Sequence, residues 1–172
     1  IHGGGFLAGS RDLIYASADV QLSAKYFLEQ GIAFACIGYR LLPTSGPIDS
    51  VGVKKCMGDS KKALQFMRYY AQDLHLNPQK FAVSGGSAGA GTSLWLASRD
   101  NMADPNASNP VDQMSTRVCA AFIRGSQSTY DLYRWETEIY HNFDGQGNHY
   151  TLDSMQALLG FDRYANFYGG VD

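Results

Sequence analysis

Apolar residues in the first 125 positions alternate between patterns typical of helices and short, nearly continuous runs typical of buried strands. Residues 14–30 carry helix-forming residues with apolar positions at helical spacing, and Gly31 ends this pattern. Residues 32–41 are almost entirely apolar, as expected of a strand buried on both faces of a parallel sheet. Residues 50–75 again predict an amphipathic helix, whose expected core positions are Ala63, Leu64, Phe66, Met67 and Tyr70.

Two further apolar runs complete the pattern. Residues 81–83 predict a strand that is followed by a glycine-rich turn and another helix, and residues 118–125 predict a second strand of the buried type. Strands and helices therefore alternate along the chain. This order is typical of a doubly wound, mostly parallel sheet in an α/β fold with right-handed crossovers.

The pattern of apolar and polar residues changes in residues 126–172, where aromatic side chains are interleaved with polar residues and glycines. No clear further strand appears before the last residue. We expect residues 1–125 to form the partial α/β core and residues 126–172 to follow it as an aromatic-rich, helical segment.

The turn after residues 81–83 reads GGSAG at positions 85–89 and matches the pattern GxSxG. In a strand–turn–helix context this pattern is typical of a nucleophile elbow, in which Ser87 sits on a sharp turn flanked by small residues. By itself the pattern is also compatible with a plain glycine-rich turn or a phosphate-binding loop. A second motif at residues 2–6, HGGGF, favours the elbow, because an HGGG loop supplies oxyanion-hole N–H groups in lipases and esterases.

With both motifs present, the chain resembles the alpha/beta-hydrolase superfamily, specifically its esterase and lipase branch of hormone-sensitive-lipase-like and carboxylesterase-like enzymes. Residues 38–43, GYRLLP, are similar to the YRLxP segment of that branch, and the resemblance covers residues 1 to about 125. One position departs from it. Many hormone-sensitive-lipase-like members have Asp before the serine, whereas this chain has Gly86.

The resemblance implies a serine hydrolase that cleaves carboxylic esters through an acyl-enzyme, with Ser87 as the catalytic nucleophile. It implies an oxyanion hole formed by the N–H groups of Gly3, Gly4 and Ala88, in a loop supported by His2 and Gly5. It also implies that residues 126–172 form a helical cap or lid over the acyl pocket; the alternative is that their aromatic side chains form the ordinary core of two packed helices. A peptidase or amidase of the same fold, or a non-catalytic binding module, are the alternatives. The module is disfavoured because the serine and the loop glycines are all present.

The general base should be a histidine oriented by an acid, in the chain order serine, acid, histidine. We expect the sheet to be incomplete at both ends and the chain to be a fragment, with the acid and the histidine downstream of it. Within the chain, His149 is a weaker candidate for the base, with Asp131 or Asp144 as the acid.

Composition and charge limit the classes of molecule that the chain is expected to bind. The chain has 172 residues, 45% of them hydrophobic, and a formal net charge of −2, which is typical of one globular domain. This charge gives no reason to expect nucleic acid as a partner, and no run is long enough to span a membrane. We interpret Cys36, Cys56 and Cys119 as small, buried apolar residues. No spacing of histidines and cysteines indicates a metal site, and we expect no cofactor. The partner that the resemblance implies is a small-molecule ester.

Overall fold

The computed structural model describes residues 1–127, 129–131, 134 and 166–169, which belong to two compact units. The first unit comprises Ile1–Leu41 and Lys55–Ser126. The second comprises Leu42–Lys54 and the described residues from Gln127 onward.

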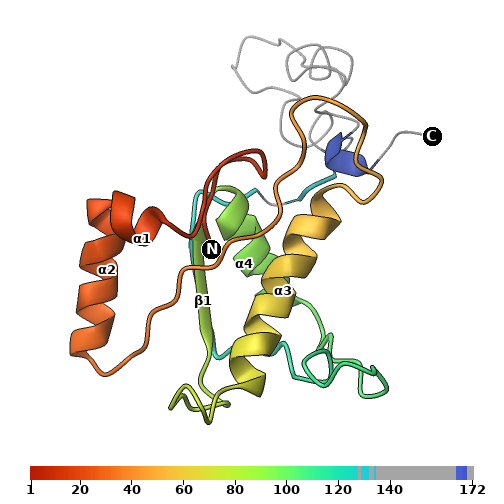
Figure 1. Ribbon diagram of the computed structural model, residues 1–172. Helices are drawn as coiled ribbons and strands as arrows, with labels where there is room; N and C mark the ends of the chain where they lie inside the picture. The colour runs from red at the N-terminus through yellow and green to blue at the C-terminus, as the bar shows by residue number, and fades with distance from the viewer. Residues whose placement is uncertain (128, 132–133, 135–165, 170–172) are drawn as a thin grey trace. The chain divides into compact units, whose positions relative to one another are not determined.

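A parallel pair of strands forms the centre of the first unit (Figure 1). Strand β1, Ala82–Gly86, pairs with β2, Ala120–Arg124, in a register that places Ala82 opposite Ala120 and Gly86 opposite Arg124. Helix α4, Ala88–Ser98, begins two residues after β1 ends. Parallel strands joined through a helix confirm the α/β class and the strand, turn and helix expected around Ser87.

The core of this unit forms where β1, α4 and helix α3, Val53–Tyr69, meet. Its buried members are Leu64, Phe81, Val83 and Leu96, and partly buried side chains such as Ile1 and Trp95 pack against them. Burial of such side chains contributes roughly 1.5–3 kcal/mol each, so this cluster is what holds β1 and its turn in place.

The predicted helix over residues 14–30 is two helices: α1, Leu13–Ala16, and α2, Ala18–Glu29. Ser17 separates them because its backbone is extended, with φ −118° and ψ 118°, and its hydroxyl accepts a hydrogen bond from the N–H of Val20 at 3.4 Å. A serine in this position caps the second helix. The predicted helical periodicity is therefore correct, whereas the prediction of one continuous helix is wrong.

The strand predicted over residues 32–41 is not formed in the described part of the chain. One edge of β1 pairs with β2, and beside its Ser84 runs Ile1, whose nitrogen donates to the Ser84 carbonyl at 2.7 Å. A strand requires a neighbour that satisfies its backbone, and no described segment pairs with residues 32–41 as one. The apolar run is consequently an extended connection.

Helix α3 also differs from the expectation in the face that it buries. Its buried residues are Cys56, Met57, Ser60, Leu64 and Gln65. Phe66 and Tyr70, both expected in the core, are 50% and 37% exposed, and their rings contact each other with centroids 4.6 Å apart. The helical period was predicted correctly, but polar Ser60 and Gln65 occupy the buried stripe because they find hydrogen-bond partners there.

Side chains of α3 hold the connection between α4 and β2. Gln65 donates through Nε2 to the carbonyls of Asp112 and Met114, at 2.9 and 2.8 Å. Three residues to each side along the helix, Lys62 forms an ion pair with the Asp112 carboxylate and Arg68 donates to the carbonyls of Ser115 and Arg117. This spacing places the three donors on one side of the helix.

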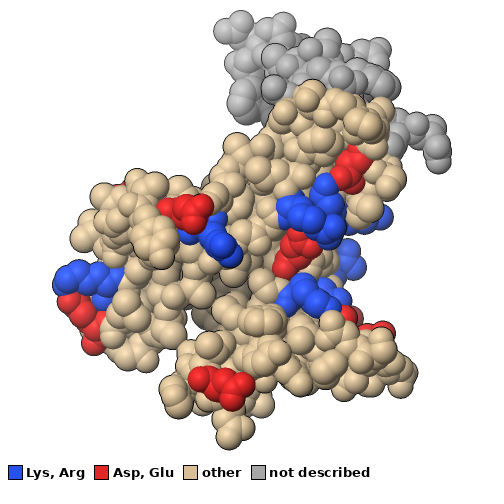
Figure 2. All heavy atoms as spheres, in the orientation of Figure 1, with Lys and Arg blue, Asp and Glu red and all other residues tan. Residues whose placement is uncertain are grey.

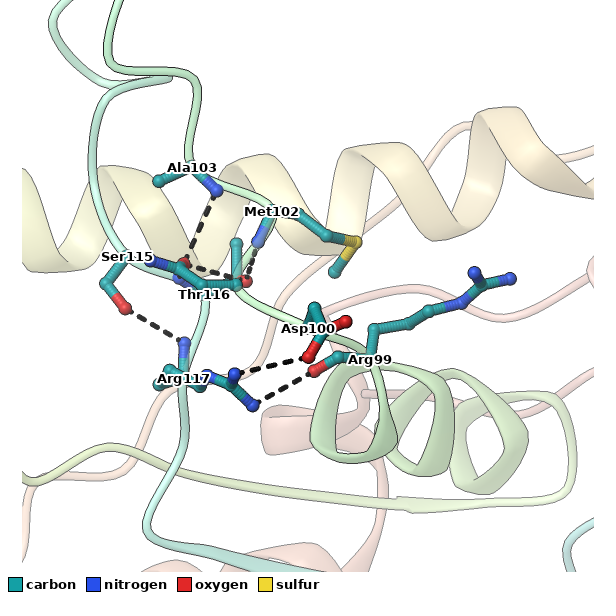
Figure 3. Close-up of polar contacts among 8 residues, drawn as sticks. Arg99, Asp100, Met102, Ala103, Ser115, Thr116 and Arg117 are labelled. Atoms are coloured by element: carbon teal, nitrogen blue, oxygen red, sulfur yellow. Dashed lines mark hydrogen bonds and ion pairs between the residues drawn. The ribbon is translucent and has the colours of Figure 1, made fainter.

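Polar contacts also join the start of this connection to its end, next to the last residues of α4, as Figure 3 shows. The Thr116 hydroxyl accepts from the N–H of Met102 at 2.9 Å, and Arg117 contacts the Asp100 carboxylate at 3.4 Å and the Arg99 carbonyl at 3.3 Å. These contacts tie the start and the end of the connection together and so fix where β2 begins.

In the second unit, the loop before α3 is tied to the segment 166–169. Asn166 is fully buried, accepts from the N–H of Asp49 at 2.5 Å and donates to the carbonyl of Pro43 at 3.3 Å. The chain passes so close here that a β-carbon on Gly52 would lie 2.4 Å from the Phe167 carbonyl oxygen. The assignment of residues 126–172 as a cap falls largely outside the described residues and stays a prediction.

Basic and acidic side chains lie next to each other on the face drawn in Figure 2, rather than in a field of one sign. The described helices include none with the length and apolarity needed to cross a bilayer. All three cysteines are free thiols: Cys56 is buried and Cys36 half-buried, whereas Cys119, expected in a buried strand, is exposed.

Candidate active site

Ser87 occupies the sharp turn between β1 and α4. Its backbone has φ 54° and ψ −121°, a conformation that residues other than glycine avoid and that costs about 1–3 kcal/mol. Two backbone bonds hold the turn: the Ser87 N–H donates to the Arg124 carbonyl at 3.1 Å, and the Ser87 carbonyl accepts from Gly91 at 3.0 Å. The strain is therefore maintained by the end of β2 and the first turn of α4, and the serine side chain is left exposed.

The glycines around Ser87 are not equivalent. A β-carbon on Gly89 would lie 2.2 Å from the Ile1 carbonyl oxygen, and one on Gly85 would lie 2.3 Å from the backbone of Gly89. Both positions therefore require glycine. At Gly86, by contrast, a β-carbon would only reach ordinary contact with the Arg124 carbonyl at 3.8 Å. The position at which this chain departs from the hormone-sensitive-lipase pattern has room for a side chain.

The loop of residues 2–6 lies against the turn that carries Ser87. A β-carbon on Gly3 would come within 2.8 Å of the Gly86 carbonyl oxygen and 3.3 Å of the Ser87 β-carbon. The loop turns sharply at Gly4, which has φ 103° and whose carbonyl accepts from both Leu7 and Ala8, at 2.9 and 3.0 Å. Two motifs more than eighty residues apart in the sequence therefore meet in one small volume.

The two segments that meet here include the backbone N–H groups of Gly3, Gly4 and Ala88. Within the part of the chain that the structure describes, no acceptor bonds the N–H groups of Gly3 and Gly4. Ala88, the buried first residue of α4, lies at the positive end of the helix dipole. Donors of this kind can stabilise negative charge that develops on a carbonyl oxygen next to Ser87.

His2 is built into the loop and does not contact the Ser87 hydroxyl. Its ring is buried, stacks on Tyr39 with centroids 4.0 Å apart, and its Nδ1 lies 2.8 Å from the Gly3 carbonyl oxygen, to which it donates. Burial lowers the pKa of His2 against the opposing effect of this hydrogen bond. His2 is thus neutral near pH 7, with its proton on Nδ1, and its hydrogen bond to the Gly3 carbonyl lies within the loop. Gly5, at φ 60°, continues the same turn in a left-handed conformation.

Arg40 and Asp59 form an ion pair within this unit. The guanidinium donates to both carboxylate oxygens at 2.8 Å, and the Arg40 N–H adds a third bond at 2.9 Å. Burial acts to raise the pKa of Asp59, but the bonds and charge of Arg40, with the charge of Lys55, lower it overall. The pair fixes the backbone immediately after Tyr39.

The acid and the base are not assembled by the described residues. Neither His2 nor His75 hydrogen-bonds Ser87, whose hydroxyl has no hydrogen-bond partner among the described residues. Asp131 lies in the second unit, where its N–H donates to the Thr129 hydroxyl at 3.0 Å. His149 and Asp144 are outside the described residues, so both assignments stay predictions. Within the part of the chain that the structure describes, no group of three or more His, Cys, Asp and Glu side chains could hold a metal ion.

Sequence reasoning missed Tyr39. Its buried hydroxyl donates to the His2 carbonyl at 3.0 Å and to the Gly3 carbonyl at 3.3 Å. The only signal was its place in the GYRLLP segment, which identified the segment without indicating what the tyrosine contacts.

A parallel α/β sheet with a serine on a strained strand-to-helix turn, faced by an HGGG loop, defines an alpha/beta-hydrolase fold, here incomplete. The BD-FAE family model matches residues 1–165, and the chain belongs to this alpha/beta-hydrolase-like family. No curated protein matches the chain significantly.

Solved structures that resemble the chain are esterases. The apo form of Thermogutta terrifontis esterase 2 is 26% identical, with a TM-score of 0.56, over 73% of this chain and 42% of the esterase. The same esterase phosphonylated by sarin is matched at 23% identity and a TM-score of 0.58, over 92% of this chain and 49% of that one. An acetyl ester-xyloside bifunctional hydrolase from Caldicellulosiruptor lactoaceticus, 21% identical with a TM-score of 0.59, shares the fold over 76% of this chain and 43% of its own. This chain spans less than half the length of each of these proteins.

Proposed function

We propose that this chain carries the nucleophile and the oxyanion hole of a serine hydrolase that cleaves carboxylic esters through an acyl-enzyme. The observation that carries the proposal is the approach of the Gly3 backbone to the Ser87 side chain, within 3.3 Å for a β-carbon placed on Gly3. A carbonyl group attacked by the serine would lie beside the loop N–H groups. Membership of an alpha/beta-hydrolase-like family and the esterase neighbours support the same reaction class.

In this mechanism the Ser87 oxygen attacks the carbonyl carbon of the ester while a base takes the hydroxyl proton. The carbonyl π electrons move onto oxygen, and the N–H groups of Gly3, Gly4 and Ala88 stabilise the resulting oxyanion. Collapse expels the alcohol, which receives the proton, and leaves an acyl group on Ser87. Water then repeats the sequence and releases the carboxylic acid. Loss of one oxyanion donor in such a site reduces kcat by about 10²–10³.

The base is a histidine that the described residues do not include. We propose that it lies, with its acid, in a further part of the protein, because the superfamily's chain order puts both after the nucleophile and this chain spans only 42% of the esterase that it matches. The alternative within this chain is His149 with Asp131 or Asp144. In the full-length protein, His149→Gln and Asp131→Asn should leave kcat within about twofold; a loss of about 10³-fold for both would assign the base and acid to this chain.

Esters with short acyl groups are the substrates best supported. A structure of the Thermogutta esterase has propionate bound, and the Caldicellulosiruptor neighbour is named as an acetyl ester hydrolase. Activity should therefore be greatest on acetyl and propionyl esters and should fall as the acyl chain lengthens.

The test is Ser87→Ala in the full-length protein, assayed on p-nitrophenyl acetate. The matched control is Ser84→Ala, three residues earlier in β1, whose side chain is also exposed. We expect kcat to fall by about 10⁴-fold or more for Ser87→Ala and to be unchanged for Ser84→Ala. Equal activity in the two variants would remove the nucleophile assignment.

A fluorophosphonate probe gives an independent measurement, since the Thermogutta esterase is known in phosphonylated form. Peptide mass spectrometry should locate the adduct on Ser87. A folded protein that the probe does not label would favour a non-catalytic binding module, whereas labelling with hydrolysis of amides rather than esters would favour a peptidase or amidase of the same fold.

A further inference from the structure

The hydroxyl of Tyr39 contacts two consecutive carbonyl groups of the HGGG loop. It lies 3.0 Å from the His2 oxygen and 3.3 Å from the Gly3 oxygen, so its single proton is shared between them. The peptide units that contain these carbonyls also contain the N–H groups of Gly3 and Gly4. These are the same two N–H groups that the proposed function assigns to the oxyanion hole.

A planar trans peptide directs its N–H opposite to its C=O. No cis peptide bond occurs among the described residues, so holding the two carbonyl oxygens also sets the direction of both N–H groups. His2 contributes a second restraint on the Gly3 carbonyl through Nδ1, at 2.8 Å. The Tyr39 side chain, which lies outside the loop, therefore orients the N–H groups of Gly3 and Gly4 away from its own hydroxyl.

The loop requires such a restraint because it is rich in glycine. Gly4 and Gly5 have φ values of 103° and 60°, and glycine samples both signs of φ with little cost. Without a restraint, the peptide unit between Gly3 and Gly4 could rotate and present its carbonyl oxygen to the site. An oxygen in that position would repel the oxyanion instead of stabilising it.

Tyr39 is itself held on three sides. Its ring stacks on His2 at an interplanar angle of 14°, and it packs against Phe6, with centroids 5.8 Å apart. The next residue, Arg40, is anchored to Asp59 by bonds from its backbone and its side chain. The position of the hydroxyl is thus determined by ring packing against His2 and Phe6 and, outside the loop, by the ion pair of the neighbouring Arg40.

Resting on the proposed function, we infer that Tyr39 is a positioning residue of the oxyanion hole, which acts by orienting the peptide units of Gly3 and Gly4. It does not act as an acid or a base. Its effect belongs to the transition state and the tetrahedral intermediate, because the oxyanion develops there and is absent from the bound ester.

The experiment is Tyr39→Phe in the full-length protein, which removes the hydroxyl and keeps the ring on His2. We expect kcat on p-nitrophenyl acetate to fall by roughly 10- to 100-fold while KM changes by less than about threefold. Affinity for a trifluoromethyl ketone, which forms an oxyanion adduct with the serine, should fall in parallel with kcat/KM. The control is Tyr26→Phe, an exposed tyrosine of α2, which should leave each value unchanged.

A role in packing alone would change the midpoint of thermal unfolding without this division between kcat and KM. If Tyr39→Phe does not fold, 3,5-difluorotyrosine at position 39 retains the ring and the donor but ionises at lower pH. Its kcat should then decline at high pH, where the phenolate no longer donates, relative to the unmodified protein.

An unchanged kcat in Tyr39→Phe, or an unchanged pH profile with the fluorinated residue, would overturn the inference. The proposed function fails by a different result, since it requires only that Ser87→Ala abolish turnover. An active Tyr39→Phe variant with an inactive Ser87→Ala variant would leave the hydrolase in place and remove Tyr39 from its oxyanion hole.

Discussion

The backbone of Gly89 approaches Ile1 so closely that a β-carbon on Gly89 would lie 2.2 Å from the Ile1 carbonyl oxygen. This contact seats the chain just before the HGGG loop on the first turn of α4. The approach involves backbone atoms on both sides, so no side-chain rearrangement can relieve a substitution there.

Gly89→Ala should therefore destabilise the full-length protein by about 3 kcal/mol or more, because a clash with main chain must move one of the two segments. Gly86→Ala is the matched variant in the same motif, and its β-carbon would meet only ordinary contacts. It should change the free energy of unfolding by less than about 1 kcal/mol. Urea denaturation of both variants measures this difference, and equal stabilities would contradict the close approach.

Replacing Ser87 by glycine should give a more stable protein than replacing it by alanine. Both variants lack the hydroxyl and should be inactive on esters. Glycine adopts φ 54° without the steric cost that alanine retains, so Ser87→Gly should be more stable than Ser87→Ala by about 1 kcal/mol. Thermal unfolding of the two variants is the measurement. A more stable Ser87→Ala would show that the turn carries no strain.

Gln65→Ala should destabilise the protein by about 1–3 kcal/mol, because it removes a fully buried side chain and leaves the part-buried carbonyls of Asp112 and Met114 without their donor. The control is Gln72→Ala, at an exposed position beyond the end of α3, which should have an effect below about 0.5 kcal/mol. Chemical denaturation checks both. Similar losses in the two variants would mean that α3 does not anchor this connection through Gln65.

The burial of His2 predicts a pH dependence of stability. Its pKa in the folded protein lies below the ordinary value of 6.5, so the unfolded chain takes up the proton first as the pH falls. The contribution of neutral His2 is fully present above pH 6.5 and is lost progressively as the pH drops toward the folded pKa. The free energy of unfolding should decrease between about pH 7 and pH 5, and less steeply in His2→Gln. Equal slopes in the two proteins would exclude His2 as the source.

The sequence alone was sufficient for features that depend on near neighbours. The glycines around Ser87 predict a sharp turn because they remove steric collisions with neighbouring residues. The apolar runs at 81–83 and 118–125 predict strands because a continuous apolar run is a local property of the sequence. Two motifs in the right order were enough to indicate the family. None of these inferences required knowledge of which segments touch.

Tertiary structure decided which distant segments meet and which faces they bury. Only packing brings Gly3 to Ser87 and the Tyr39 hydroxyl to two loop carbonyls, and only the absence of a pairing neighbour among the described residues leaves 32–41 without a strand. Likewise Gln65 is buried and Phe66 is exposed, because a hydrogen-bonded amide fits where α3 meets the connection. Such outcomes depend on atoms far away in the chain, and a residue pattern of period two or 3.6 contains no information about them.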